Sequence, residues 1–106
     1  MAKYLIQGSY TVEGAKGLMK DGASSRRQVI DGMLKGLGGR LESMYFAFGD
    51  CDVFLIADLP DNATAAAVAI AVNTSGAVRT RTTVLLTAEE LDQAGKKQVG
   101  YKPPGR

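Results

Sequence analysis

Segments with the apolar spacing of β-strands alternate along this chain with segments that have the apolar spacing of α-helices. The order of these segments is compatible with few folds. Four segments are rich in aromatic and other β-favouring residues, as expected of strands: residues 4–10, 41–48, 53–57 and 78–86. Two stretches between them, residues 11–37 and 63–72, carry apolar side chains at helical spacing. The short link between the second and third strands makes them an antiparallel hairpin. The order is therefore strand, helix, strand, strand, helix, strand.

The first helical stretch contains residues that interrupt and end a helix. Asp21-Gly22 interrupts it, so we expect a helix that is broken or bent there. Ser24 or Ser25 is placed to cap the second half. Gly38-Gly39 ends that half, as glycines after a helix commonly do. Its apolar residues form one stripe: Val29, Ile30, Met33, Leu34 and Leu37.

The second helical stretch has almost no polar face. Pro60 ends the preceding strand, and Asp61 can cap the helix that follows. Residues 63–72 are alanine, valine and isoleucine apart from one threonine. A helix that is apolar all round is usually buried on more than one side. Gly76 then closes the helix before the fourth strand.

The C-terminal residues add a helix and a tail to this pattern. Thr87 and Glu90 have the spacing of a capping box for a helix over residues 88–97. Residues 99–106 contain Pro103-Pro104 and should be extended. Because an apolar tail favours a groove over free solvent, we expect Tyr101 to pack on its own or a neighbouring subunit.

This order of elements predicts an α+β fold of the ferredoxin-like type, with an antiparallel sheet and helices on one face. Right-handed crossovers place the first and third strands in the centre. A chain of 106 residues buries about 65% of its unfolded surface, which supports one core and hence one domain over residues 1–106. Neither face of the sheet is cleanly polar, as a solvated face would be. We therefore expect the helix-free face to meet another subunit, in a dimer or larger homo-oligomer.

Several chemistries are excluded by composition. The chain has no histidine and one cysteine, so Cys/His zinc sites, internal disulfides and histidine-dependent triads are impossible. We accordingly expect no metal and no cofactor. The formal net charge of +2 is too small to indicate a nucleic-acid partner. No apolar run is long enough to span a membrane, and the N-terminus lacks the apolar segment of a signal peptide, which predicts a cytoplasmic protein.

Three stretches resemble one known family, the GYD-domain proteins. They are Lys3-Tyr4-Leu5-Ile6-Gln7-Gly8-Ser9-Tyr10-Thr11, Tyr45-Phe46-Ala47-Phe48-Gly49-Asp50-Cys51-Asp52 and Val84-Leu85-Leu86-Thr87. The namesake motif usually has a tyrosine between its glycine and aspartate positions, so Cys51 departs from the pattern and the role of that tyrosine is unfilled. The resemblance implies a small bacterial protein of the dimeric α/β-barrel type. That architecture hosts many unrelated functions, so the resemblance assigns none.

Polar residues near the hairpin are candidates for a site. Asp50 and Asp52 could act as acid and base or bind a cation, although aspartates are also common in turns, and the turn interpretation is favoured. Cys51 has no histidine to activate it and stands between two carboxylates, which favours an inert thiol. Ser25 and Arg26 begin a helix, where amide groups and arginine can hold an anion; a solvated helix start is the alternative.

A second candidate lies on the fourth strand. Arg79 and Arg81 share one face, two residues apart, which is unfavourable unless solvent or an anion accompanies them. If Arg81 pairs with Asp52 across the sheet, the two form a structural ion pair at a subunit interface, and we favour this interpretation. Otherwise Arg81 and Tyr45 could hold a ligand that carries a carboxylate or phosphate.

Two classes of function remain open on these residues. The first is a homo-oligomeric small-molecule-binding or assembly protein without catalysis of its own. The second is a cofactor-free enzyme of the dimeric α/β-barrel type, resembling a monooxygenase or an isomerase. Such barrels commonly use histidine or tryptophan, and this chain has neither. The binding or assembly class is therefore preferred.

Overall fold

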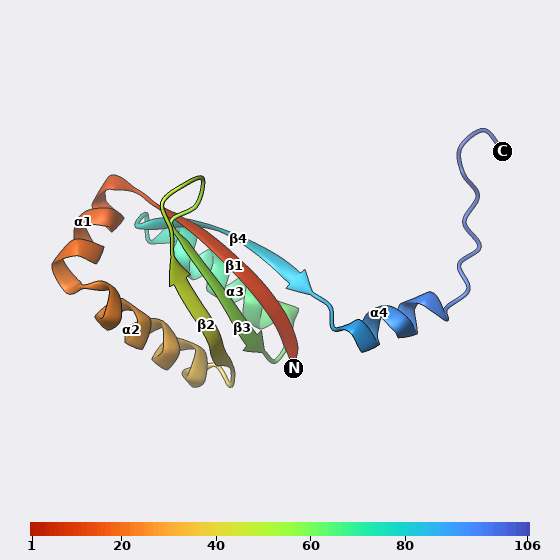
Figure 1. The fold of residues 1–106 in the computed structure, drawn as a ribbon, viewed down its shortest axis with the longest axis horizontal. Helices are drawn as coiled ribbons and strands as arrows, with labels where there is room; N and C mark the ends of the chain where they lie inside the picture. Colours follow the sequence, from red (N-terminus) through yellow and green to blue (C-terminus); the bar gives the residue numbers. More distant parts are fainter.

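The computed structural model describes all 106 residues, and its elements follow the predicted order (Figure 1). They are β1 (Ala2–Tyr10), α1 (Val12–Asp21), α2 (Ala23–Gly36), β2 (Arg40–Phe46), β3 (Val53–Leu59), α3 (Asn62–Thr74), β4 (Val78–Leu85) and α4 (Ala88–Gly95). The strands form one antiparallel sheet in the order β2-β3-β1-β4, with the first and third strands central as predicted. This is the ferredoxin-like arrangement. The sheet is open at β2 and β4, so one chain does not form a barrel.

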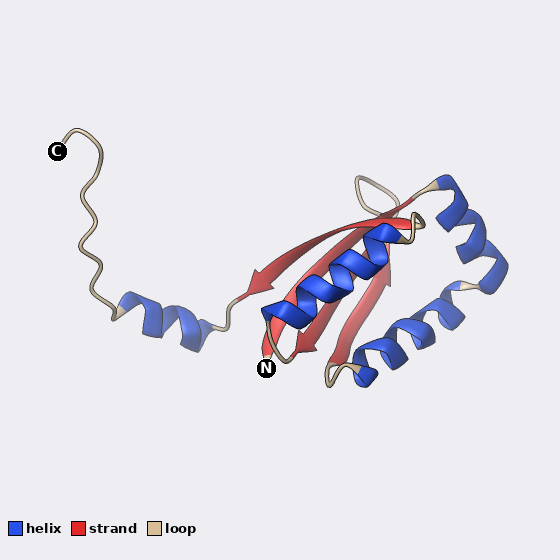
Figure 2. Cartoon of the chain, turned by 180° about the vertical axis from the view of Figure 1, so that it is seen from behind, coloured by secondary structure: helices blue, strands red, loops and turns tan.

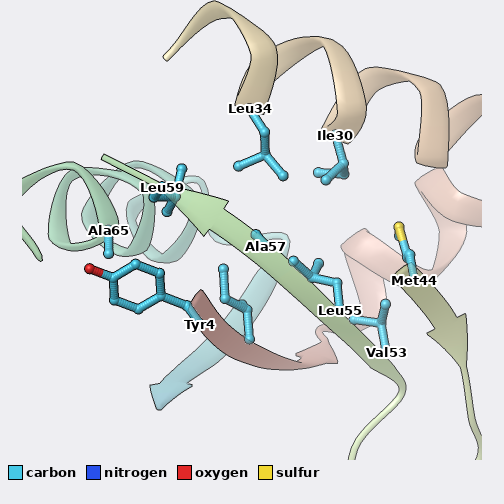
Figure 3. Close-up of a cluster of buried hydrophobic side chains, with 10 residues drawn as sticks. Tyr4, Ile30, Leu34, Met44, Val53, Leu55, Ala57, Leu59 and Ala65 are labelled. Atoms are coloured by element: carbon cyan, nitrogen blue, oxygen red, sulfur yellow. The ribbon is translucent and has the colours of Figure 1, made fainter. Parts of the chain in front are cut away.

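Helices α2 and α3 cover the same face of the sheet (Figure 2). Helix α2 packs on β2, and α3 packs on β4 and β3. Strand side chains alternate between the two faces, and those beneath the helices form the core. Ile30 and Leu34 point from α2 toward β3, where Leu55 and Ala57 meet them (Figure 3). Tyr4 is also buried there, and its hydroxyl donates to the Asn62 side chain at 2.6 Å.

Three helices are capped at their N-termini by side chains, and two of these caps, Asp61 and Thr87, are the ones predicted from the sequence. The Thr11 side chain accepts from the Gly14 amide at 3.1 Å, and Asp61 accepts from the Thr64 amide at 2.8 Å. Thr87 forms the predicted capping box at the start of α4. A side-chain oxygen in each case satisfies an amide that the first turn leaves free.

The prediction of a serine cap for α2 is wrong. Gly22 ends α1 with φ +89° and is also the first cap of α2, without a side-chain hydrogen bond. Because glycine adopts this left-handed backbone freely, α2 begins at once, at Ala23. Ser24 and Ser25 therefore lie exposed inside the first turn.

Helix α3 is less covered than its composition predicts. Only Ala65 and Val68 are buried, and Ile70 is 65% exposed. The expectation of burial on more than one side is wrong for the single chain, because the sheet covers one side of α3 and nothing in the chain covers the other. The stripe on α2 is also narrower than expected: Ile30 and Leu34 are buried, while Val29 and Leu37 are exposed.

Several predicted boundaries move by one or two residues. Strand β2 ends at Phe46, and Phe48 lies fully exposed in the loop that follows. Strand β4 ends at Leu85, and α4 ends at Gly95. No helix in the structure has the length and apolar character needed to cross a membrane.

The C-terminal residues extend away from the rest of the chain (Figure 1). Tyr101 is 71% exposed, so it does not pack on its own subunit. The radius of gyration is 16.9 Å and the molecule measures 57 × 33 × 22 Å. A compact domain of this size has a radius of gyration of about 13 Å, so the projecting C-terminus dominates the shape.

Candidate functional site

An apolar cleft lies between the sheet and the two helices that cover it. It encloses about 530 Å³, including the part open to solvent. Ile30 and Met33 of α2 line one wall, and Val68 and Val72 of α3 line the other. The floor comes from the inner face of the sheet: Ile6, Gly8, Met44, Val53, Leu55, Val78 and Thr80. Its apolar lining is typical of small-molecule pockets.

Gly8 lies in the floor of this cleft, where the side chains of two strand valines pack closely over it. Along β1 the inward positions are Tyr4, Ile6, Gly8 and Tyr10, so glycine stands where a side chain would otherwise fill the space. A Cβ at Gly8 would lie 2.9 Å from Val53 Cγ1 and 3.0 Å from a Val78 methyl. Glycine inside a strand often marks a close approach by another group. Gly8 was not among the sites predicted from the sequence, although the alternation along β1 was a signal for it.

Arg26 and Tyr10 form the polar end of the cleft. Both line it, and Arg26 is half-buried without an ion-pair partner in the chain. Glu13 and Asp21 line a neighbouring hollow with Arg26. An arginine in this position offers several N–H donors to an anion.

Burial and two nearby charges set the pKa of the Tyr10 hydroxyl at this end of the cleft. Burial raises the pKa of the Tyr10 hydroxyl, and the Asp52 carboxylate acts in the same direction, while the Arg26 charge opposes both. The hydroxyl is therefore protonated at neutral pH and can donate or accept a hydrogen bond. Asp52 also accepts from the Tyr10 backbone amide at 2.8 Å.

The predicted ion pair between Arg81 and Asp52 does not form in the chain. Arg81 lies opposite Gln7 on the helix-free face. Asp52 precedes β3 on the far side of β1, and its carboxylate is turned toward the Tyr10 amide and a hollow lined by Phe46. Strand β1 separates the two groups, so the favoured structural interpretation is wrong for the single chain.

Arg79 and Arg81 lie together, as predicted. With Gln7, Ser9 and Cys51 they line an open hollow of about 620 Å³ at one end of the helix-free face. Neither arginine has a carboxylate partner. Tyr45 is on the same face but on β2, the opposite edge of the sheet from β4. Three strand spacings, about 14 Å, separate these edges, so Tyr45 and Arg81 of one chain cannot share a small ligand.

The rest of the helix-free face has an apolar centre. Leu5, Phe54 and Ile56 lie half-buried on the central strands, and Tyr45 is 72% exposed beside them. At the far end Lys3 bridges Glu42 at 2.8 Å and Asp58 at 2.9 Å, and Arg40 joins Asp58 at 2.9 Å. An apolar centre with a polar rim is the usual composition of a protein interface.

The remaining candidates have structural surroundings. Cys51 is buried, with its Sγ 3.9 Å from the Gln7 amide nitrogen. No three Cys, Asp or Glu side chains converge closely enough to hold a metal ion. Ser25 is exposed and does not line the cleft, so of the predicted pair Ser25 and Arg26 only the arginine does.

Comparison with known proteins places the chain by family. The family model described as the GYD domain matches residues 4–94, which include all but the first two residues of the sheet and most of α4. Neither a curated protein nor a solved structure matches the chain. The match covers far more than half of the 106 residues and agrees with the resemblance found in the motifs. The chain belongs to the GYD-domain family.

Proposed function

We propose that this protein is a homo-oligomeric binding protein that takes a small ligand into the cleft between the sheet and the helices. The ligand has an apolar body and one anionic group, a carboxylate or a phosphate. The observation that carries the proposal is an apolar cleft that ends at the unpaired arginine Arg26.

The body of the cleft accounts for the apolar part of the ligand. Eleven of its fourteen lining residues are hydrophobic, and they come from all four strands and from both covering helices. Burying apolar surface contributes roughly 25 cal/mol per Å². A flat ring system or a short alkyl chain suits such walls better than a sugar or a polar peptide.

The polar end accounts for the anionic group. Arg26 and the protonated Tyr10 hydroxyl can both donate to a carboxylate or phosphate oxygen. A charge-assisted hydrogen bond contributes about 1.5–3 kcal/mol. Losing it corresponds to a tenfold to hundredfold loss of affinity.

The oligomeric part rests on the helix-free face. Its apolar centre of Leu5, Phe54 and Ile56 is only half-buried, and the chain has nothing left to cover it. A second copy packing sheet against sheet would cover it in the way that sandwich proteins cover their inner faces. We place the ligand in the cleft on the other side of the sheet, so each subunit keeps its own site.

The experiment compares two adjacent arginines. Wild type, Arg26→Gln and Arg27→Gln are titrated with 2-naphthoate and with its neutral analogue 2-naphthylmethanol, by calorimetry. Arg27 follows Arg26 directly but is exposed and does not line the cleft. We expect naphthoate to bind Arg26→Gln at least tenfold more weakly than wild type, with Arg27→Gln unchanged. The affinity for the neutral analogue should be similar in all three.

Further variants separate the cleft from the other arginines. Gly8→Ala should weaken both compounds, because its methyl group enters the floor of the cleft. Arg81→Gln should leave naphthoate binding unchanged, because Arg81 lies on the other face. Equal naphthoate affinity in wild type and Arg26→Gln would remove Arg26 as the anchor. Absence of binding by both compounds to wild type would contradict the ligand site itself.

A further inference from the structure

Residues 86–106, here called the C-terminal arm, make no hydrogen bond or ion pair with the rest of the chain. The last pairing of the sheet joins Leu85 to Lys3, and every hydrogen bond beyond it lies within the arm. All arm residues are exposed except Pro103, which is half-exposed. Figure 1 shows the arm leaving the end of β4 and running away from the sheet.

The arm has the composition of a segment that packs against something. Its exposed apolar side chains include Leu91 at 62% and Tyr101 at 71% exposure. Helix α4 has only eight residues, and helices that short are marginal in water without packing. Ala88, Leu91 and Gly95 follow one another at spacings of three and four, so they form an uncharged stripe along α4. A covering surface is missing from the single chain.

The unpaired charged residues indicate which surface could cover the arm. Glu89 and Asp92 of α4 have no ion-pair partner, and neither do Arg79 and Arg81 on the helix-free face. The salt bridges of the chain use other acids, namely Asp31, Glu42 and Asp58. The two unpaired sets are of opposite sign and are each exposed. The acidic residues of the arm lie on α4, whereas its basic residues lie beyond the end of that helix: Lys96, Lys97, Lys102 and Arg106.

In the structure of one chain these charges lie far apart. Arg79 is at the start of β4 and the arm leaves after its end, six residues later, a distance of about 20 Å along the strand. The arm then continues away from the sheet (Figure 1). In a sheet-to-sheet dimer whose two-fold axis runs across the strands, the end of β4 in one copy lies opposite its start in the other. The symmetry makes the contact twice.

We propose that the C-terminal arm of each copy lies on the helix-free face of a second copy, with Glu89 and Asp92 beside the partner subunit's Arg79 and Arg81. This inference rests on the homo-oligomer of the proposed function. The apolar side chains of the arm, Leu91 and Tyr101, then pack at the edge of the sheet-to-sheet interface.

The experiment measures the dimer dissociation constant by analytical ultracentrifugation. A chain ending at Thr87 should dissociate at least tenfold more readily than wild type. The pair Glu89→Lys/Asp92→Lys should also weaken the dimer, and so should Arg79→Glu/Arg81→Glu. All four changes together should recover most of the loss, which is the signature of direct coupling. Glu13→Lys/Asp21→Lys, on exposed acids of α1, is the control and should have little effect.

Each negative result contradicts a different part of the proposal. A truncated chain that dimerises as tightly as wild type would overturn the arm contact, and so would four combined changes that restore nothing. A truncation that lowers the melting temperature of the monomer would place the arm on its own chain, which also contradicts the proposal. Wild type that stays monomeric at every concentration would overturn the homo-oligomer of the proposed function itself.

Discussion

Gly14 shows how a single missing side chain sets the position of a helix. It is buried in α1, and a Cβ there would lie 1.8 Å from the carbonyl oxygen of Ala77. The same carbonyl accepts from the Thr11 amide at 3.0 Å, so α1 begins against the loop that leads into β4. Since backbone cannot give way as a side chain can, only glycine allows this approach.

We therefore expect Gly14→Ala to lower the free energy of unfolding by about 1–3 kcal/mol, the usual cost of overpacking. Gly17 is the matched control, because it lies in the same helix and a Cβ there would have nothing within 4 Å. Gly17→Ala should be neutral or stabilise by up to about 1 kcal/mol through helix propensity. Urea unfolding followed by circular dichroism measures both. Equal effects at the two glycines would contradict the close approach.

Asp58 couples the stability of the fold to pH. The Lys3 ammonium, with help from Arg40, holds the pKa of the Asp58 carboxyl below its ordinary value. A carboxyl with a lowered pKa in the folded state stabilises the fold above its unfolded pKa, near 4, and that stability is lost as the pH falls through the folded pKa. The cluster is partly exposed, so we expect an effect of about 1 kcal/mol at most.

Urea midpoints at pH 6 and pH 3 test this. The wild-type midpoint should fall with acid, and Asp58→Asn should show a smaller fall. The fall should not vanish, because hydrogen bonds from Thr64 also lower the pKa of Asp61. Asp31→Asn is the control, on an exposed helix pair with Lys35, and should retain the wild-type slope. An unchanged slope in Asp58→Asn would show that the cluster does not carry the pH dependence.

At the scale of elements, the sequence predicted those helix ends that are set by interactions between residues close in the chain. The caps at Asp61 and Thr87 were predictable because each needs only a hydrogen bond to an amide three residues on. The α2 cap was mispredicted because Gly22 serves both helices, which depends on the angle between α1 and α2 and not on any local preference. The sheet order followed from handedness rules that hold for most chains of this pattern.

The candidate site was harder to predict because it depends on which face each residue occupies. Arg79 and Arg81 share a face through simple alternation, so their pairing was predictable. Asp52 precedes its strand, and no periodicity fixes the direction of a loop side chain, so its bond to the Tyr10 amide was not foreseen. The cleft joins Gly8 to residues more than sixty positions away, and only the folded sheet brings them together.

At the scale of the whole molecule, the chain leaves two apolar surfaces without cover. The outer side of α3 exposes Ile70, and the helix-free face exposes Tyr45 beside the half-buried Phe54 and Ile56. The helix-free face is the better interface, because flat sheets pack on one another with interdigitated side chains. The alanine-rich side of α3 presents little area for each residue.

We therefore expect Ile56→Asp to convert the proposed homo-oligomer to a monomer. A charge at the centre of two facing sheets would be buried without a partner, and breaking an interface in this way is strongly unfavourable. Light scattering after size exclusion at micromolar concentration should give at least twice 11.2 kDa for wild type and 11.2 kDa for Ile56→Asp. Ile70→Asp, on the outer side of α3, is the matched control and should keep the wild-type mass. If Ile70→Asp were monomeric and Ile56→Asp kept the wild-type mass, the interface would lie on α3. The reason is that an introduced charge dissociates a dimer only when it lies in the interface.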